Sequence, residues 1–111
     1  MEKAEFSSSE EDRFADTGIR ECVIEEIRTL ADKHGMDKVI LFGSRARGDF
    51  TRASDIDLAV SVADAAFFHL DLEEQTTTLL KFDVLNLDLP LQDEIREEIY
   101  CNGRTIYEKV R

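Results

Sequence analysis

Two aspartates separated by one residue, Asp55 and Asp57, have the spacing of a metal-binding pair in this 111-residue sequence. They open an alternating run that continues to Val62, and the side chains of a strand alternate between its two faces. Both carboxylates should therefore project from one face, while the apolar residues between and after them face a core. Two carboxylates this close repel each other unless a positive charge lies between them. A hard divalent cation with oxygen ligands, most simply Mg²⁺, is the expected occupant.

Gly43 and Ser44 could supply the complementary half of such a site. They follow the apolar run 39–42, and Arg45 and Arg47 belong to what reads as the opening of a short helix. Because a strand that turns into a helix leaves backbone N–H groups free, this turn is suited to bind an anion. Glycine lets the backbone approach a ligand, the serine hydroxyl can donate to a phosphate oxygen, and the arginines add positive charge. A phosphate cradle beside a carboxylate pair predicts a site for a metal nucleotide.

Asp83 is a third carboxylate of interest, because it interrupts the otherwise apolar run 79–87. A carboxylate is poorly tolerated in such a strand unless it has a partner. The alternative is that Asp83 lies on an exposed face and has no role. Asp88 is a weaker competitor, since it precedes Pro90 and better suits the start of the next helix.

Hydrophobic periodicity predicts the elements that position these residues. Amphipathic runs with helical spacing predict helices at about 16–34, 63–75 and 91–100. Apolar or alternating runs predict strands at 38–42, 55–62, 79–87 and, at a sheet edge, 104–108. The expected fold class is α/β, a small mixed sheet of three or four strands with helices packed on one face.

Length and composition indicate one domain over residues 15–111, preceded by an acidic tail over residues 1–14. A capping box at Ser9 and Asp12 that starts the first helix early is the alternative for this tail. The N-terminus has no signal-peptide pattern, and no apolar run approaches the length of a membrane span. Cys22 and Cys101 are far apart in sequence and are expected to be reduced, partly buried thiols, so we expect a cytoplasmic protein.

The charge balance limits the classes of partner. Fourteen basic residues against 25 acidic ones argue against direct binding to nucleic acid, because such binding requires a positively charged surface. The net charge of −11 favours a basic protein partner, although acidity that serves only solubility is the simpler explanation from composition alone.

The Gly43-Ser44 pair, ten intervening residues and the Asp55-Ile56-Asp57 triplet resemble the signature of the DNA polymerase β-like nucleotidyltransferase superfamily. The short chain resembles the minimal nucleotidyltransferase group within it, over roughly residues 37–108. This resemblance implies the polymerase β-like palm fold. Members of the group are commonly antitoxins paired with a ribonuclease toxin of the HEPN class, so the resemblance also implies a hetero-oligomer with such a toxin.

The resemblance implies a role for each candidate residue. The superfamily keeps a third carboxylate on the strand beside the aspartate pair, and Asp83 is its match. Two Mg²⁺ ions would be held during turnover by the three carboxylates, Asp55, Asp57 and Asp83, with Asp83 plausible as the general base. ATP would be held by four residues of the turn and short helix: Gly43, Ser44, Arg45 and Arg47. The product would be AMP attached to a tyrosine of the toxin.

Two other functions stay open from the sequence. The chain could neutralise a toxin by stoichiometric binding without catalysis, or it could act as an oligomer on a small-molecule acceptor. An intact set of mutually repelling acids favours an enzyme over a binding module. The sequence does not specify the base preference, the acceptor residue, the oligomeric state, whether the site turns over, or whether the N-terminal tail is ordered.

Overall fold

A computed structural model describes residues 14–61 and 65–109. The expected tail falls almost wholly on residues 1–13, which lie outside the described part. Its last residue, Phe14, already belongs to the hydrophobic core.

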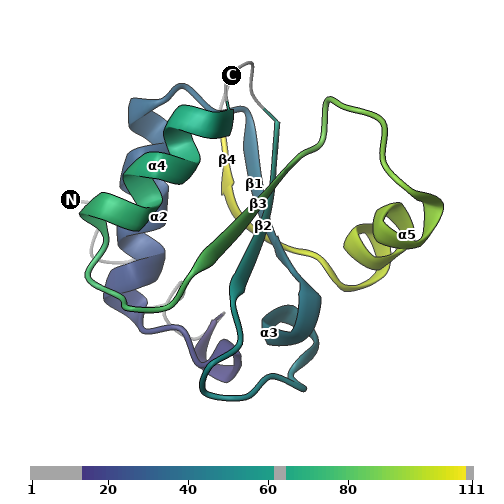
Figure 1. Cartoon of the computed structure of the whole chain (residues 1–111), viewed down its shortest axis with the longest axis horizontal. Helices are drawn as coiled ribbons and strands as arrows, with labels where there is room; N and C mark the ends of the chain where they lie inside the picture. Colours follow the sequence, from purple (N-terminus) through teal and green to yellow (C-terminus); the bar gives the residue numbers. More distant parts are fainter. Residues whose placement is uncertain (1–13, 62–64, 110–111) are drawn as a thin grey trace.

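A mixed four-stranded sheet forms the centre of the molecule, which confirms the predicted fold class (Figure 1). Its strands are β1 (Lys38–Phe42), β2 (Ile56–Ser61), β3 (Phe82–Asn86) and β4 (Arg104–Glu108). The order across the sheet is β3-β2-β1-β4. β1 runs antiparallel to both of its neighbours, whereas β2 and β3 are parallel. Such a parallel pair requires a long connection, and the helix α4 (Ala65–Gln75) provides it.

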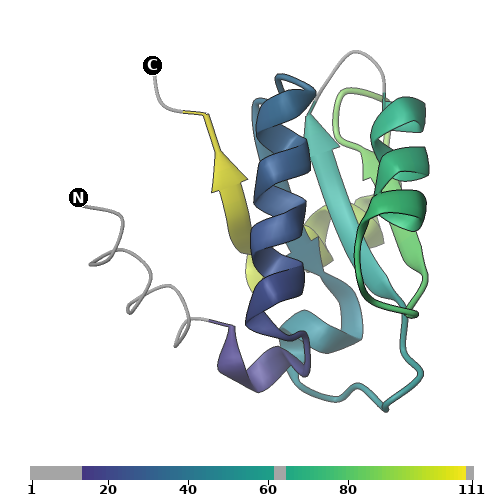
Figure 2. The same cartoon turned by 90° about the vertical axis from the view of Figure 1, so that its left-hand side faces the viewer.

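The two longest helices, α2 (Glu21–Lys33) and α4, cover one face of the sheet (Figures 1 and 2). The core lies between them and the sheet. Its buried side chains come from one face of each strand and from the inner stripe of each helix, and they include Ile27, Leu30, Val39, Leu41, Ile56, Leu58, Val60, Phe68 and Leu72. The alternation predicted for 55–62 is observed over Ile56–Ser61, except that Ala59, on the other face, is also buried.

The helix α5 (Asp93–Asn102) lies on the opposite side of the sheet (Figure 1). The expectation of helices on one face therefore describes α2 and α4 only. The end of α5 packs closely on β1, since a Cβ on Gly103 would come within 2.8 Å of Ile40 Cγ2. No residue of α5 is fully buried, so this helix covers the second face incompletely.

The first predicted helix, 16–34, is divided in the structure. A short 3₁₀ turn, η1 (Ala15–Thr17), ends at Gly18, whose positive φ of 73° breaks the helical path before α2 begins. The sequence pattern missed this break, because Ile19 is buried and keeps the helical spacing without belonging to α2. The third strand begins at Phe82 rather than residue 79, since Leu79 is fully exposed.

Both cysteines, Cys22 and Cys101, are free and exposed rather than partly buried. Within residues 14–61 and 65–109, no helix has the length and apolar character needed to cross a bilayer.

Candidate active site

Asp57 and Asp83 are neighbours on one face of the sheet. In the parallel register of β2 and β3 they lie directly opposite each other. Phe42, the last residue of β1, is opposite Asp57 on its other side. Directly paired residues project from the same face, and here it is the face turned away from the buried Leu58 and Ile56. The sheet thus places Asp57 beside the turn that follows β1, with Asp83 on the next strand.

The turn itself, from β1 into the short helix α3 (Gly43–Arg47), packs against Asp57. Gly43 has a φ of 77°, a left-handed backbone conformation that is unfavourable for residues with a side chain. A Cβ at this position would overlap the Asp57 carboxylate. Only glycine therefore satisfies both the backbone geometry and the space available, so the backbone of the turn meets the carboxylate directly.

The Asp57 carboxylate is energetically unfavourable in its ionised form. Partial burial, and then the negative charges of Asp83 and Asp55, raise its pKa from 3.8 to about 6. The positive charge of Arg47 acts in the opposite direction and lowers this pKa. Asp55 and Asp83 are exposed, and Asp55 lies one residue before β2 begins. The acids that the sequence singled out therefore do interact with one another electrostatically.

The chemistry of these acids fits a divalent cation. They offer hard oxygen ligands, and their mutual repulsion would be relieved by positive charge. Over the described ranges, however, no three acidic, histidine or cysteine side chains converge on one point as a ready-made metal centre. The Asp57–Asp83 pair could hold a cation, with Asp55 joining from the loop.

Ser44 lies half-buried in the first turn of α3. Its carbonyl oxygen accepts hydrogen bonds from the backbone N–H groups of Gly48 (2.8 Å) and Asp49 (3.2 Å), which close the short helix. The structure gives Phe42 as the N-cap, without a side-chain capping bond, so the Ser44 hydroxyl is not used as a cap.

Arg45 occupies a different place from the one expected of a phosphate-binding residue. Its side chain is only 2% exposed, and it donates hydrogen bonds to backbone carbonyl oxygens. These bonds reach Thr17 (2.9 Å), Ser54 (3.1 Å) and Arg52 (3.2 Å). The guanidinium also lies over the ring of Phe50, 4.8 Å from its centre. Arg45 therefore fixes the loop that leads to Asp55, and its charge is committed there.

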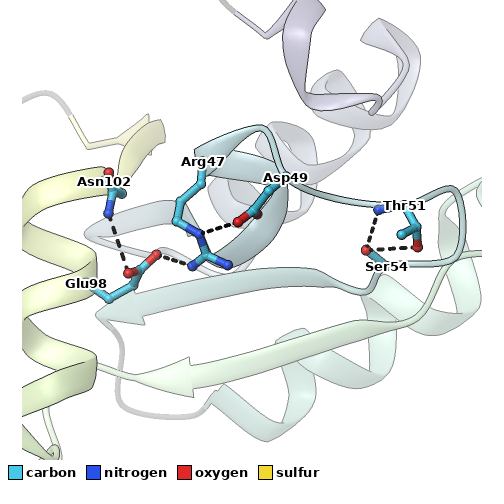
Figure 3. Close-up of polar contacts among 6 residues, drawn as sticks. All are labelled: Arg47, Asp49, Thr51, Ser54, Glu98 and Asn102. Atoms are coloured by element: carbon cyan, nitrogen blue, oxygen red, sulfur yellow. Dashed lines mark hydrogen bonds and ion pairs between the residues drawn. The ribbon is translucent and has the colours of Figure 1, made fainter.

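Arg47 is the arginine that remains beside the carboxylates. Its Nε lies 3.2 Å from Asp49 and its Nη1 lies 2.5 Å from Glu98 of α5 (Figure 3). The Glu98 carboxylate also accepts a 3.4 Å hydrogen bond from Asn102. Hydrogen bonds to Glu98 and Asp49 raise the pKa of Arg47, so it stays charged. This ion pair connects the predicted phosphate turn to the helix on the second face of the sheet.

Glu98 was not among the residues singled out from the sequence. It lies 51 residues from Arg47 and is one of several acids in α5, so no local pattern distinguishes it. The spacing of Arg45 and Arg47 in the sequence, by contrast, indicates that only one of them can reach the site. Residues two apart on a helix do not face the same direction, so Arg45 and Arg47 could not both point toward one ligand.

The loop before Asp55 is held by a compact turn. The backbone N–H of Thr51 donates to the Ser54 hydroxyl oxygen (2.9 Å), and the two hydroxyl groups lie 3.3 Å apart (Figure 3). The backbone N–H of Ser54 donates in turn to the carbonyl of Thr51 (3.1 Å). Together with Arg45, this turn determines where the chain enters β2.

Comparison with known proteins gives a family match over most of the chain. Residues 25–111 match the family described as polymerase beta, nucleotidyltransferase. A protein of Methanocaldococcus jannaschii assigned as a protein adenylyltransferase is 48% identical over 48 residues. That alignment covers 43% of this chain and only about half (46%) of the relative.

Two solved toxin–antitoxin structures share the fold. One is of the MntA–HpeT pair, with a TM-score of 0.60 and 20% identity, and the other contains AMP-PNP, with a TM-score of 0.60 and 22% identity. Each match covers 78% of this chain and 73% of the known chain.

Proposed function

The chain is a member of the polymerase β-type nucleotidyltransferase family, and from that membership we propose that it transfers AMP from ATP to a hydroxyl group of a protein partner. The observation that carries the proposal is the Asp57–Asp83 pair, of which Asp57 lies against Gly43, the residue of the turn that has no side chain. In this proposal the carboxylates and the turn after β1 are the two halves of a metal-nucleotide site at one end of the strands.

The acidic residues would hold the metal and move the proton. Asp57 and Asp83, joined by Asp55, are the proposed ligands of Mg²⁺, with two ions during turnover. Bound Mg²⁺ would neutralise the triphosphate and lower the pKa of the attacking hydroxyl. Asp83, exposed at the open edge of the pair, is the proposed general base that accepts the hydroxyl proton.

The turn after β1 would hold the phosphates. Gly43 lets the backbone approach the terminal phosphates, and the Ser44 hydroxyl donates to a phosphate oxygen. Of the two candidate arginines, Arg47 is the one that would neutralise the charge of the phosphates, because Arg45 is buried in contacts with the loop. Arg45 positions the loop instead.

The reaction is an in-line substitution at the α-phosphorus. The acceptor oxygen forms a bond to the α-phosphorus while the bond to the bridging oxygen breaks, and pyrophosphate leaves with the electron pair. We propose that a second molecule presents the hydroxyl. The likeness to toxin–antitoxin structures supports a toxin as that molecule, and we propose a tyrosine of a HEPN-class toxin in the cytoplasm.

A binding antitoxin without catalysis is the second candidate. The acidic surface, with a net charge of −11, is suited to stoichiometric contact with a basic toxin. The raised pKa of Asp57 favours the enzyme, since a protein that needs only a docking surface gains nothing from adjacent acids that repel each other.

Intact-mass spectrometry of the purified chain with Mg²⁺, ATP and the product of the adjacent gene tests the proposal. We expect the mass of one AMP to be added to the partner by the wild type and not by Asp57→Asn/Asp83→Asn. A circular dichroism spectrum of the variant controls for folding. A tight complex that forms without any added mass, and that survives the double substitution, would leave the binding antitoxin as the function.

A further inference from the structure

Lys81 lies just before β3, the strand that carries Asp83, and both side chains belong to the same face of the sheet. Leu80, before Lys81, packs against the core, and Phe82, after it, belongs to the core. Lys81 and Asp83, by contrast, are exposed. Since the side chains of an extended segment alternate between two faces, Lys81 projects from the face that carries the acids.

The pairing of β2 with β3 places Lys81 beside Asp55. The backbone N–H of Ile56, the first residue of β2, donates a 2.9 Å hydrogen bond to the Lys81 carbonyl. Asp57 is paired with Asp83. Two residues earlier on each strand, the same parallel register sets Asp55 beside Lys81. The two strands thus present four neighbouring charged side chains, three acids and one lysine.

The charge of Lys81 is not committed to a carboxylate. In the part of the chain that the structure describes, its side chain has no ion pair or hydrogen bond, even with the adjacent Asp55. Arg47, the other cation of the site, differs in this respect because it pairs with Asp49 and Glu98. The ammonium group of Lys81 is therefore available to an anion that binds over this face of the sheet.

The two cations lie on opposite sides of the acids. In the strand order β3-β2-β1-β4, Arg47 follows β1 and Lys81 precedes β3, so β2 lies between them. The charge of Arg47 acts on Asp57 of β2 from the β1 side. Adjacent strands are about 4.8 Å apart, so the turn after β1 and the start of β3 are about 10 Å apart. Arg47 and Lys81 can thus contact opposite ends of one triphosphate.

We propose that Lys81 is a catalytic residue that binds the α-phosphate of ATP and stabilises the negative charge on it in the transition state. The inference rests on the proposed function, in which the turn after β1 holds the terminal phosphates and Asp83 accepts the proton of the hydroxyl. The α-phosphorus then lies between these groups, over β2, within reach of the four-carbon stem of Lys81. Lys81 transfers no proton, and pyrophosphate leaves with the electron pair.

The binding of nucleotide fragments tests this assignment without requiring turnover. AMP retains the α-phosphate, pyrophosphate represents the two terminal phosphates, and adenosine has no phosphate. Displacement of a ribose-labelled fluorescent ATP from the full chain, with Mg²⁺ present, measures the affinity for each. Lys81→Met should weaken AMP about tenfold and leave pyrophosphate and adenosine within about twofold of the wild type. Arg47→Ala should weaken pyrophosphate and leave AMP within about twofold.

A second lysine provides the matched control. Lys33 is exposed and pairs with Asp71 on the helical side of the sheet, so Lys33→Met removes the same charge away from the site. It should match the wild type for all three fragments. The alternative role for Lys81 is to offset the repulsion among the acids without touching the nucleotide. Equal weakening of AMP and pyrophosphate by Lys81→Met would indicate that role and overturn the proposal.

Turnover provides the second readout. Lys81→Met should lower kcat for AMP transfer about tenfold or more in addition to raising KM for ATP, because the contact strengthens in the transition state. An unchanged kcat would contradict the catalytic role of Lys81 and leave the proposed function intact. If AMP and pyrophosphate respond to the two variants as expected but no AMP is transferred to any protein, the phosphate assignment stands and the proposed enzymatic function fails.

Discussion

Asp57 lies directly opposite Asp83 across the β2–β3 pair, and Gly43 of the turn packs on its carboxylate. Burial and two neighbouring negative charges hold its pKa near 6. A residue in this position destabilises the folded chain at neutral pH unless a ligand compensates. The site therefore stores unfavourable electrostatic energy that a cation can release, and the first two predictions follow from this.

Replacing Asp57 by Asn should stabilise the metal-free protein at neutral pH. A pKa of about 6 in place of 3.8 corresponds to about 3 kcal/mol in the free energy of unfolding, and solvent screening of this partly exposed group reduces the expected gain to about 1–2 kcal/mol. Because the pKa of Asp57 is raised in the folded state, the free energy of unfolding of the wild type falls by this amount as the pH rises from about 4 through about 6. Urea unfolding of both proteins at pH 4 and pH 7.5 measures the difference, which should be absent at the lower pH. A variant that is less stable than the wild type at pH 7.5 would contradict the repulsion.

Mg²⁺ should raise the melting temperature of the wild type and leave Asp57→Asn nearly unchanged. The ion relieves repulsion that the variant no longer has, and it binds the ionised carboxylate, so the shift should diminish as the pH falls below about 6. Differential scanning fluorimetry with and without MgCl₂ between pH 5 and pH 8 measures it. Asp71→Asn is a suitable control, because Asp71 pairs with His34 on the helical side of the sheet. An equal shift in all three proteins would indicate nonspecific ion effects.

Gly43→Ala should abolish the site, whereas Gly48→Ala should be tolerated. Both glycines have positive φ, 77° and 97°, so both substitutions strain the backbone by about 1 kcal/mol. At Gly48 nothing lies within 4 Å of the added Cβ, while at Gly43 the methyl group overlaps the Asp57 carboxylate. Comparing the two variants thus distinguishes the effect of backbone strain from the effect of a clash with the Asp57 carboxylate. AMP transfer and the Mg²⁺-dependent thermal shift should be lost in Gly43→Ala alone, and parallel losses in both variants would attribute the effect to strain.

The two arginines should respond to substitution in opposite ways. Arg45→Ala removes hydrogen bonds to four backbone carbonyl groups, those of Thr17, Thr51, Arg52 and Ser54, so it should lower the free energy of unfolding by about 3 kcal/mol. Arg47→Ala removes the two surface ion pairs with Asp49 and Glu98 and should leave stability within about 1 kcal/mol, but it should raise KM for ATP. Thermal unfolding and steady-state kinetics on each variant distinguish the roles. A large stability loss in Arg47→Ala would make that residue structural as well.

Local patterns in the sequence were sufficient for β1 and for the face of β2 that carries Asp57. The apolar run 38–42 coincides with β1, and the alternation after Asp55 placed Asp57 on the face away from the core, because both signals come from adjacent residues. The pairing of Asp57 with Asp83 depended on the family resemblance, since strand order is not written in any short segment. Family membership is confirmed by the match over residues 25–111.

Contacts between distant segments explain what the sequence did not reveal. Arg45 is a buried structural residue because the Thr17 carbonyl, 28 positions earlier, comes to meet it. Glu98 pairs with Arg47 because α5 crosses to the second face of the sheet, which helical periodicity alone does not specify. The break at Gly18 was missed for a similar reason, since the Arg45 guanidinium and the Phe50 ring occupy the space beside it.

The bond from Arg45 to the Thr17 carbonyl changes where the working unit of this protein begins. The family match starts at residue 25, within α2, yet the loop that delivers Asp55 is tied through Arg45 to a residue eight positions before that start. Phe14, which lies under the Arg28 and Arg104 guanidinium groups, extends the same tie further toward the N-terminus. A version trimmed to the matched region would keep every acidic residue of the site and the Arg45 bonds to the carbonyls of Arg52 and Ser54, but it would lose the bond that ties Arg45 to Thr17. We therefore expect the folded unit to begin no later than Thr17, eight residues before the boundary that the family match gives.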